Sequence, residues 1–385
     1  MSIRAISVSV LAIAALAGTA NAQFFSNGNL VVTRLGDGIA TLGSTAALNT
    51  LVEFNRSGVA TGQSVALNGS LVGVRLTNSG SATSEGALTG STDRRYLSTA
   101  GYDATAATAS VSSSANPTTA RVVGVIDTWT GTTNYVSFTS ATPATSAYSG
   151  NNIRSSIVDG NNVYMSGTST TSGGVRLGTL SGGTSAIQSG TLTNSRVVNI
   201  ADFGSGNILF ASSSSGAFVG INIITGSGAT NLITNAMLRN SGAGTASPYD
   251  YFFADDRTVY VADDTASGTG GLIKLARTGG LAGDVTTGTW AFGYSTLVST
   301  VTGGNAGLRG LAGELVGNQV NLFGITTDNR LVSYTEVLSA ALPSSFTTLA
   351  SGGTNFAFRG VEIVPTPGAA ALLGLAGLVA FRRRR

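Results

Sequence analysis

The chain has 385 residues, including 53 glycines, six prolines, no cysteine and no histidine; 42% of its residues are hydrophobic and 10% are charged. This composition disfavours collagen-like and charge-driven disordered chains, and the missing cysteines exclude disulfides and thiolate metal sites. Arg4 and Arg382–Arg385 supply five of the 21 cations, so the body has 16 cations against 18 acidic residues and no electrostatic reason to bind nucleic acid.

The first 22 residues, MSIRAISVSVLAIAALAGTANA, have the order of a secretory signal. An arginine and an apolar run are followed by the small residues Ala20 and Ala22, directly before Gln23. This order predicts a signal peptide that is cleaved before Gln23, and therefore export by Sec-type machinery. A buried N-terminal helix is the alternative. Residues 1–22 are excluded from the expected fold.

Five segments of the body share one plan: an apolar strand, a tight turn of Asp, Gly, Asn or Arg, and a second apolar strand. They are 85–104, 152–168, 195–213, 247–264 and 307–327. Most are followed by a third and a fourth strand-like run. Four-strand units that recur every few tens of residues predict the blades of an all-β propeller.

A sixth first strand, at 356–365, has no partner strand after it. The start of the mature chain supplies three strand-like runs, 29–38, 50–58 and 64–69, that can complete this blade. We therefore expect a propeller over residues 23–364 with six four-stranded blades, closed by N- and C-terminal strands; the irregular spacing leaves seven or five blades as alternatives. Closure pairs the edges that an open sheet would expose.

The missing residue types limit the possible chemistry. Without histidine and cysteine, a Ser-His-Asp triad, a Cys-His pair and the usual zinc sites are excluded. Two carboxylates remain sufficient to hydrolyse a glycosidic bond. The candidates are Asp255, Asp256, Asp263 and Asp264, with Asp103, Asp127, Asp159 and Asp202 near other strand ends.

The alternative for these acids is a structural role in turns and loops. We assign no catalytic residue and no metal ligand from the sequence. Calcium prefers oxygen ligands of this kind, but the spacing matches no EF-hand or β-roll loop, so no cofactor is expected.

Arginines recur at similar places in the first strand of four repeat units: Arg154, Arg196, Arg309 and Arg359. The first strand of a propeller blade lines the centre, so these guanidiniums are candidates to surround it and bind an anionic sugar or a carboxylate. The alternative is that each arginine pairs with a carbonyl or an aspartate of a neighbouring strand.

The C-terminal residues have three ordered elements. Val364, Pro365, Thr366 and Pro367 precede an apolar run, and the chain ends in Arg382, Arg383, Arg384 and Arg385. As a helix, the apolar run would be about 21 Å long, which is short of the roughly 30 Å hydrocarbon layer. Arginines after such a helix halt translocation at the cytoplasmic face.

This ending closely resembles the PEP-CTERM sorting signal of exported Gram-negative proteins, with Thr366 in place of the central glutamate. The resemblance covers about the last 22 residues. It implies a hydrophobic helix that lies transiently in the cytoplasmic membrane and is removed by an exosortase-like protease. An ordinary C-terminal membrane anchor is the alternative.

We therefore expect an exported, non-enzymatic cell-surface or extracellular-matrix protein whose propeller presents a binding surface to polysaccharide or protein. Two alternatives remain. One is a carbohydrate-active enzyme that uses paired carboxylates on the same scaffold, and the other is a permanently anchored envelope protein with a role in assembly.

Overall fold

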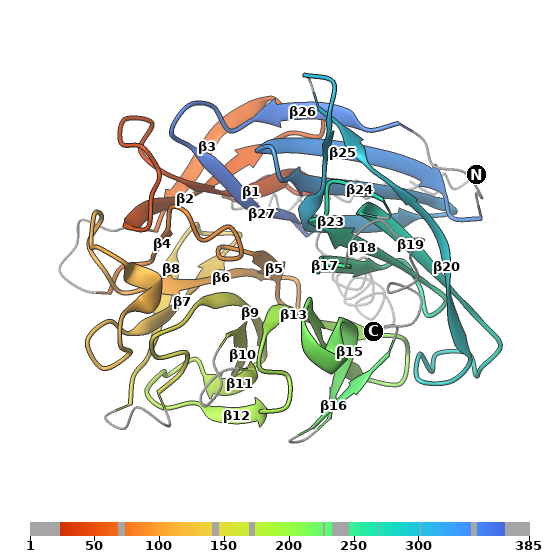
Figure 1. Cartoon of the computed structure of the whole chain (residues 1–385), viewed down its shortest axis with the longest axis horizontal. Coiled ribbons are helices and arrows are strands. Elements are labelled where there is room, and N and C mark those ends of the chain that lie inside the picture. Colours follow the sequence, from red (N-terminus) through yellow and green to blue (C-terminus); the bar gives the residue numbers. More distant parts are fainter. Residues whose placement is uncertain are drawn as a thin grey trace, which may run out of the picture.

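A computed structural model describes residues 24–67, 74–140, 146–168, 174–225, 228–232, 246–268, 270–300, 302–339 and 345–365. In these ranges the chain consists of β-strands and two short 3-10 segments, η1 (Val111–Ser113) and η2 (Gly216–Phe218). The strands form small sheets around a common centre, so the fold is all-β and propeller-like (Figure 1). The expected signal peptide and C-terminal helix lie outside the described residues. Within those residues, no helix has the length and apolar character needed to cross a membrane.

Four separate sheets have four strands each, paired antiparallel in chain order. The first contains β9 (Ile153–Asp159), β10 (Asn162–Gly167), β11 (Gly174–Thr179) and β12 (Ala186–Ser189). The second contains β13 (Ser195–Asp202), β14 (Asn207–Ser213), β15 (Gly220–Thr225) and β16 (Gly228–Asn231). The third contains β17 (Pro248–Phe253), β18 (Thr258–Asp263), β19 (Gly271–Thr278) and β20 (Thr289–Thr296). The fourth contains β23 (Leu308–Val316), β24 (Gln319–Thr326), β25 (Arg330–Val337) and β26 (Thr347–Ser351), and a small hairpin of β21 (Val298–Ser299) and β22 (Asn305–Ala306) precedes it.

The remaining strands form one sheet of nine strands with two four-stranded halves. One half contains β27 (Ala357–Ile363), β1 (Leu30–Leu35), β2 (Ala46–Phe54) and β3 (Ala60–Ala66). The other contains β5 (Leu88–Gly90), β6 (Tyr96–Tyr102), β7 (Arg121–Asp127) and β8 (Thr133–Phe138). The short strand β4 (Thr77–Ser79) joins the halves because it pairs with both β2 and β6.

The two ends of the body meet in the first half of this sheet. Strand β27 pairs antiparallel with β1, with Val361 opposite Val32. Both side chains are buried in one apolar cluster with Phe54 and Phe358, whose rings meet edge to face. The prediction that the strand at 356–365 pairs with the strand-like run at 29–38 is therefore confirmed.

The five predicted hairpins are also present, as β5–β6, β9–β10, β13–β14, β17–β18 and β23–β24. The β9–β10 turn shows why the sequence forms them. Asp159 pairs with Asn162, so Gly160 and Asn161 make a two-residue loop, and Gly160 has the positive φ of 57° that such a loop favours.

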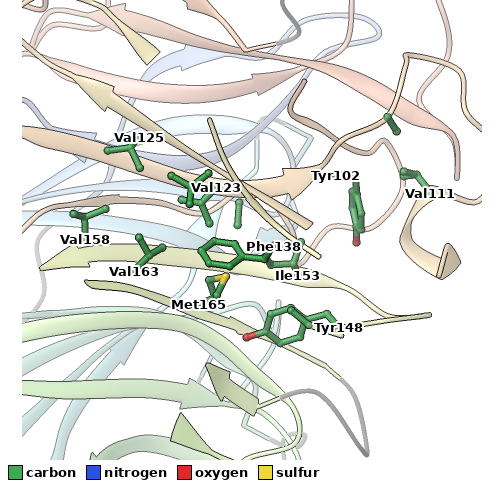
Figure 2. Close-up of a cluster of buried hydrophobic side chains, with 14 of the residues drawn as sticks. Tyr102, Val111, Val123, Val125, Phe138, Tyr148, Ile153, Val158, Val163 and Met165 are labelled. Atoms are coloured by element: carbon green, nitrogen blue, oxygen red, sulfur yellow. The ribbon is translucent and has the colours of Figure 1, made fainter. Parts of the chain in front are cut away.

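Apolar side chains of neighbouring sheets interlock between β6–β8 and β9–β10 (Figure 2). Phe138 lies in the middle of this cluster, against Val163 and Met165, and is 1% exposed. Gly178 of β11 makes room for the ring, because a Cβ at that position would lie 2.1 Å from a Phe138 ring carbon. Burying a phenylalanine side chain contributes about 2 to 3 kcal/mol.

The first strand of each four-stranded set is innermost, and these strands contact one another in a closed cycle (Figure 1). The order around the cycle is β27, β5, β9, β13, β17 and β23. The cycle places side chains from sequence-distant strands side by side at the centre of the propeller.

Candidate functional site

The four arginines singled out in the sequence all lie in inner strands. Arg154 is the second residue of β9, Arg196 of β13 and Arg309 of β23, and Arg359 is the third residue of β27. They therefore lie near the beginning of their strands, at one end of the propeller centre, which we call the arginine end.

Each arginine coincides with an irregularity in strand pairing. In β9, Ser155 pairs with Ser166 and Ile153 pairs with Gly167, so Arg154 has no partner residue of its own. The same shift of register falls at Arg196, Arg309 and Arg359. A β-bulge bends its strand and redirects a side chain, which explains how four separate strands can turn these side chains toward one place.

That place is Tyr249, which sits at the corresponding bulge of β17. Tyr249 is 3% exposed, and the Arg196 guanidinium lies 4.9 Å from the centre of its ring. Burial raises the pKa of Tyr249, and the charges of all four arginines oppose that rise. The charges of all four guanidiniums therefore act on one phenol, although the arginines come from four different strands.

Neighbouring residues already bind each guanidinium. Arg196 and Arg309 share one carboxylate oxygen of Asp264, at 3.2 Å and 3.6 Å. Arg359 donates to the carbonyl oxygen of Gly80 at 2.8 Å. Arg154 donates to the Asn194 side chain and, at 3.1 Å, to the carbonyl oxygen of Ser195. The Nε atoms of all four arginines are buried and have no hydrogen-bond partner.

Cations exceed anions at the arginine end. Besides Asp264, the nearby carboxylates are the buried Asp263, opposite Pro248, and Glu85, which accepts hydrogen bonds from Tyr102, Asn152 and the Ser79 backbone. Burial raises the pKa of Glu85, with those hydrogen bonds opposing the rise. Burial lowers the pKa of Arg154 only to about 10, so this group stays charged at neutral pH. Even with all three carboxylates ionised, the four guanidiniums leave a net charge of about +1.

Most of the aspartates considered as catalytic candidates have structural partners. Asp255 caps the β17–β18 turn through the Arg257 backbone, and Asp256 binds the Arg277 guanidinium at 2.7 Å. Asp263 accepts backbone hydrogen bonds from Ser247 and Thr265. The structure thus gives the first three of this group structural partners and places Asp264 among the arginines.

The other four candidate acids also have structural partners, although Asp202 and Asp255 line one cavity. Asp103 pairs with Arg75, Asp127 with Arg95, Asp159 with Thr92, and Asp202 caps its own turn. In the ranges that the structure describes, no three residues of the types His, Cys, Asp or Glu are grouped so as to hold a metal ion.

Three functional candidates escaped the sequence reasoning: Tyr249, Asp250 and Glu362. Tyr249 occupies the arginine position of its repeat, so an alignment of SPYDYFF with NSRVVNI could have revealed it. Burial raises the pKa of Asp250 to about 8 and that of Glu362 to about 7. The sequence signal for Asp250 and Glu362 is a single acidic residue inside an apolar strand.

Two residues of the predicted sorting signal are described. Val364 is buried and continues the β27 pairing through backbone hydrogen bonds with Asn29 and Gly28, at 2.8 and 2.9 Å, and Pro365 follows it. The other predicted targeting residues lie outside the described ranges: Ala20, Ala22, Gln23, Thr366, Pro367 and Arg382–Arg385.

No family model matches the chain, and no curated protein matches it. Among solved structures, it is similar to the periplasmic gluconolactonase PpgL of Pseudomonas aeruginosa, with a TM-score of 0.44 and 15% identity over 83% of this chain and 82% of that one. It is also similar to a chain of the nidogen/laminin complex, with a TM-score of 0.47 and 9% identity over 88% of this chain and 99% of that one. The description of this chain as propeller-like rests on its own sheets.

Proposed function

We propose that this chain is an exported, non-enzymatic cell-surface or extracellular-matrix protein whose propeller binds acidic polysaccharide at the arginine end. The observation that carries the proposal is the position of Arg154, Arg196, Arg309 and Arg359 near the beginning of inner strands of one closed cycle. Arg196 lies over the Tyr249 ring and shares Asp264 with Arg309. Guanidinium groups bind carboxylates and sulfates through paired hydrogen bonds, and here they outnumber the local carboxylates.

A ligand can reach part of this cluster. The side chains of Arg196 and Arg309 are 15% and 20% exposed, and their shared partner Asp264 is 19% exposed. A uronate carboxylate that approaches this pair would compete with Asp264 for its hydrogen bond from Arg196 and for its ion pair with Arg309. We therefore place the first contact of the ligand at Arg196 and Arg309.

We also propose that the nine-stranded sheet comprises two blades, which gives six four-stranded blades in all. In support, β27–β1–β2–β3 and β5–β6–β7–β8 each follow the inner-to-outer order of the separate sheets. A closed ring of six explains why the arginines of four blades face one another at the centre.

Export and sorting form the second part of the proposal. The signal-like start and the PEP-CTERM-like end motivate it: Sec-type machinery would export the chain, and an exosortase-like protease would process the tail. Mass spectrometry of the mature protein tests this part. Cleavage before Gln23 and loss of Arg385 are expected, whereas a retained Arg385 favours the permanently anchored envelope protein.

Binding to polygalacturonate, with neutral dextran as the reference, tests the arginine end. We expect the double variant R196Q/R309Q to lose at least about tenfold in affinity, because two charge-assisted contacts disappear. D264N should bind more tightly than the native chain, since it releases both guanidiniums. The matched control R75Q/R257Q removes two positive charges elsewhere and should bind normally.

Equal losses of affinity in R196Q/R309Q and in the control R75Q/R257Q would attribute the effect to net charge alone and reject the site. Unchanged binding by a folded R196Q/R309Q variant would also reject the site. Tight binding of acidic peptides without binding of polygalacturonate would mean that the ligand of the arginine end is a protein and not a polysaccharide. Release of sugar products, abolished by a carboxylate substitution, would establish the carbohydrate-active enzyme instead.

A further inference from the structure

A cavity of about 700 Å³ lies at the other end of the inner strands. Most of its lining comes from Gly90, 199–203, 251–255, 311–315 and 362–365, which lie in the later part of five of the six inner strands or just after them. Arg196 lies at the second position of β13 and Phe203 follows its last residue, so the two ends are separated by about 23 Å of strand. The cavity is therefore distinct from the arginine end.

The charge of this lining has the opposite sign. Its acidic side chains are Asp202, Asp255, Glu314 and Glu362, and its basic ones are Arg56 and Arg94. Arg56 binds both oxygens of Glu314, at 2.7 and 3.0 Å, and so neutralises that carboxylate. Three acids then remain against Arg94, which leaves the fully ionised lining with a net charge of about −2.

Backbone groups hold the Glu362 carboxylate in this lining. Its two oxygens accept hydrogen bonds from the backbone N–H groups of Gly90 and Ile363, at 3.1 and 2.9 Å. Asp250 lies near it, 2% exposed, and likewise accepts only backbone bonds, from Tyr251 and Leu311. In the described part of the chain, neither carboxylate is hydrogen-bonded to a cation.

The wall of the cavity also offers aromatic faces and an unused polar atom. Phe203, Phe252 and Phe253 line it and are partly exposed, and the rings of Phe203 and Phe253 meet edge to face at 5.2 Å. Tyr251 lines it too, is 2% exposed, and its hydroxyl has no hydrogen-bond partner of ordinary geometry. Burial raises the pKa of Tyr251 well above its usual value, and the nearby Asn199 backbone opposes that rise. A buried hydroxyl without a partner marks a place where a ligand can supply one.

These features fit an organic cation better than a metal ion. Calcium takes six to eight oxygen ligands, whereas the described residues hold no group of three acids suited to a metal. Aromatic faces attract ammonium groups, and a carboxylate without a cation supplies the counter-charge.

We propose that this cavity binds an organic ammonium ion that carries a flat apolar group, with Glu362 as its counter-ion and the Tyr251 hydroxyl as a second acceptor. The apolar group packs against the phenylalanines. The propeller thus carries an anion site and a cation site at opposite ends of one ring of strands.

Isothermal titration calorimetry of the full chain with benzylamine tests this site. We expect saturable binding of one benzylamine per chain, at least tenfold weaker binding of the neutral analogue benzyl alcohol, and no calcium binding. E362Q should lose at least tenfold in affinity for benzylamine. D37N, which removes one negative charge from an exposed loop, should bind like the native chain.

Proton release provides a second measurement that needs no variant. The pKa of Glu362 is about 7, with Arg94 lowering it and Asp250 as the other titratable neighbour. Binding at pH 7 should therefore release about half a proton, measured in two buffers of different ionisation enthalpy, and almost none at pH 9. Equal affinity for benzyl alcohol, unchanged binding by E362Q, or tighter binding of calcium would each overturn the proposal. Normal benzylamine binding by R196Q/R309Q would show that the two ends act independently.

Discussion

Tyr249 and Thr83 are joined by a hydrogen bond that spans 166 positions of the sequence: the phenol donates to the Thr83 carbonyl oxygen at 2.9 Å. Tyr249 belongs to β17, whereas Thr83 precedes β5 in another part of the ring. The bond therefore ties two sheets together at the place where the arginines converge, and it holds the phenol in a fixed position among them.

Removing this hydroxyl should weaken the fold modestly. We expect Y249F to lower the free energy of unfolding by about 1 kcal/mol, the usual net value of one hydrogen bond, because the buried ring keeps its packing. Urea unfolding measures the change. Y164F, at a partly exposed tyrosine of β10, is the control; a loss in the control as large as that in Y249F would deny the bond any special role.

The pairing of strands could be predicted from the sequence, whereas the partners of charged groups could not. Alternating apolar residues and turn residues such as Gly160 locate hairpins, because both signals are local. The grouping of the four arginines with Tyr249 could not be predicted without knowing how the strands are arranged in a ring, since these residues come from five different strands. Strand β4 was missed because its three residues, TNS, have no apolar pattern.

The burial of acidic residues in the inner strands also could not be predicted from the sequence. A single carboxylate in an apolar strand such as PYDYFF is compatible with a side chain in solvent, and only the closed cycle of inner strands makes Asp250 buried. The arginines were found because their repetition in four units is visible without the fold.

Gly178 should tolerate no larger side chain. A methyl group there would lie 2.1 Å from a ring carbon of Phe138, so we expect G178A to lower the free energy of unfolding by about 1 to 3 kcal/mol through overpacking. Thermal unfolding measures the effect. Gly43 has no neighbour within 4 Å of such a methyl group, so G43A is the matched control and should be neutral; equal effects of both changes would contradict the packing argument.

The only lysine of the chain, Lys274, forms a buried ion pair with Glu336. Three tyrosine hydroxyls, those of Tyr260, Tyr294 and Tyr334, surround the same carboxylate. We expect K274M to lower the free energy of unfolding by about 3 to 5 kcal/mol, because it leaves Glu336 charged and buried without its cation.

The double variant K274M/E336Q separates the ion pair from general packing damage. It should recover much of the loss, since neither charge remains to be desolvated. Chemical unfolding of the native chain and the three variants gives the coupling energy. Strictly additive losses would mean that the two residues do not act as a pair.

The stability of the protein should fall as the pH rises from 5 to 8. The pKa of Asp250 is about 8 in the folded chain, raised by burial, and about 3.9 in an unfolded one. Between these values the folded chain keeps a proton that the unfolded chain has released, so this contribution is complete below about pH 4 and is lost as the pH approaches 8. Glu362, Glu85 and Asp263 have raised pKa values and act in the same direction.

The range from pH 5 to 8 is well suited to this measurement because the chain has no histidine that would titrate within it. D250N keeps an uncharged side chain of the same shape, so its stability should depend on pH less steeply, by at most about 1.4 kcal/mol per pH unit. Urea unfolding at pH 5, 6, 7 and 8 measures both slopes, with D37N as the control that keeps the native slope. A native stability that is flat or rises over this range would mean that Asp250 stays ionised in the folded protein, and that a cation not yet identified lies beside it.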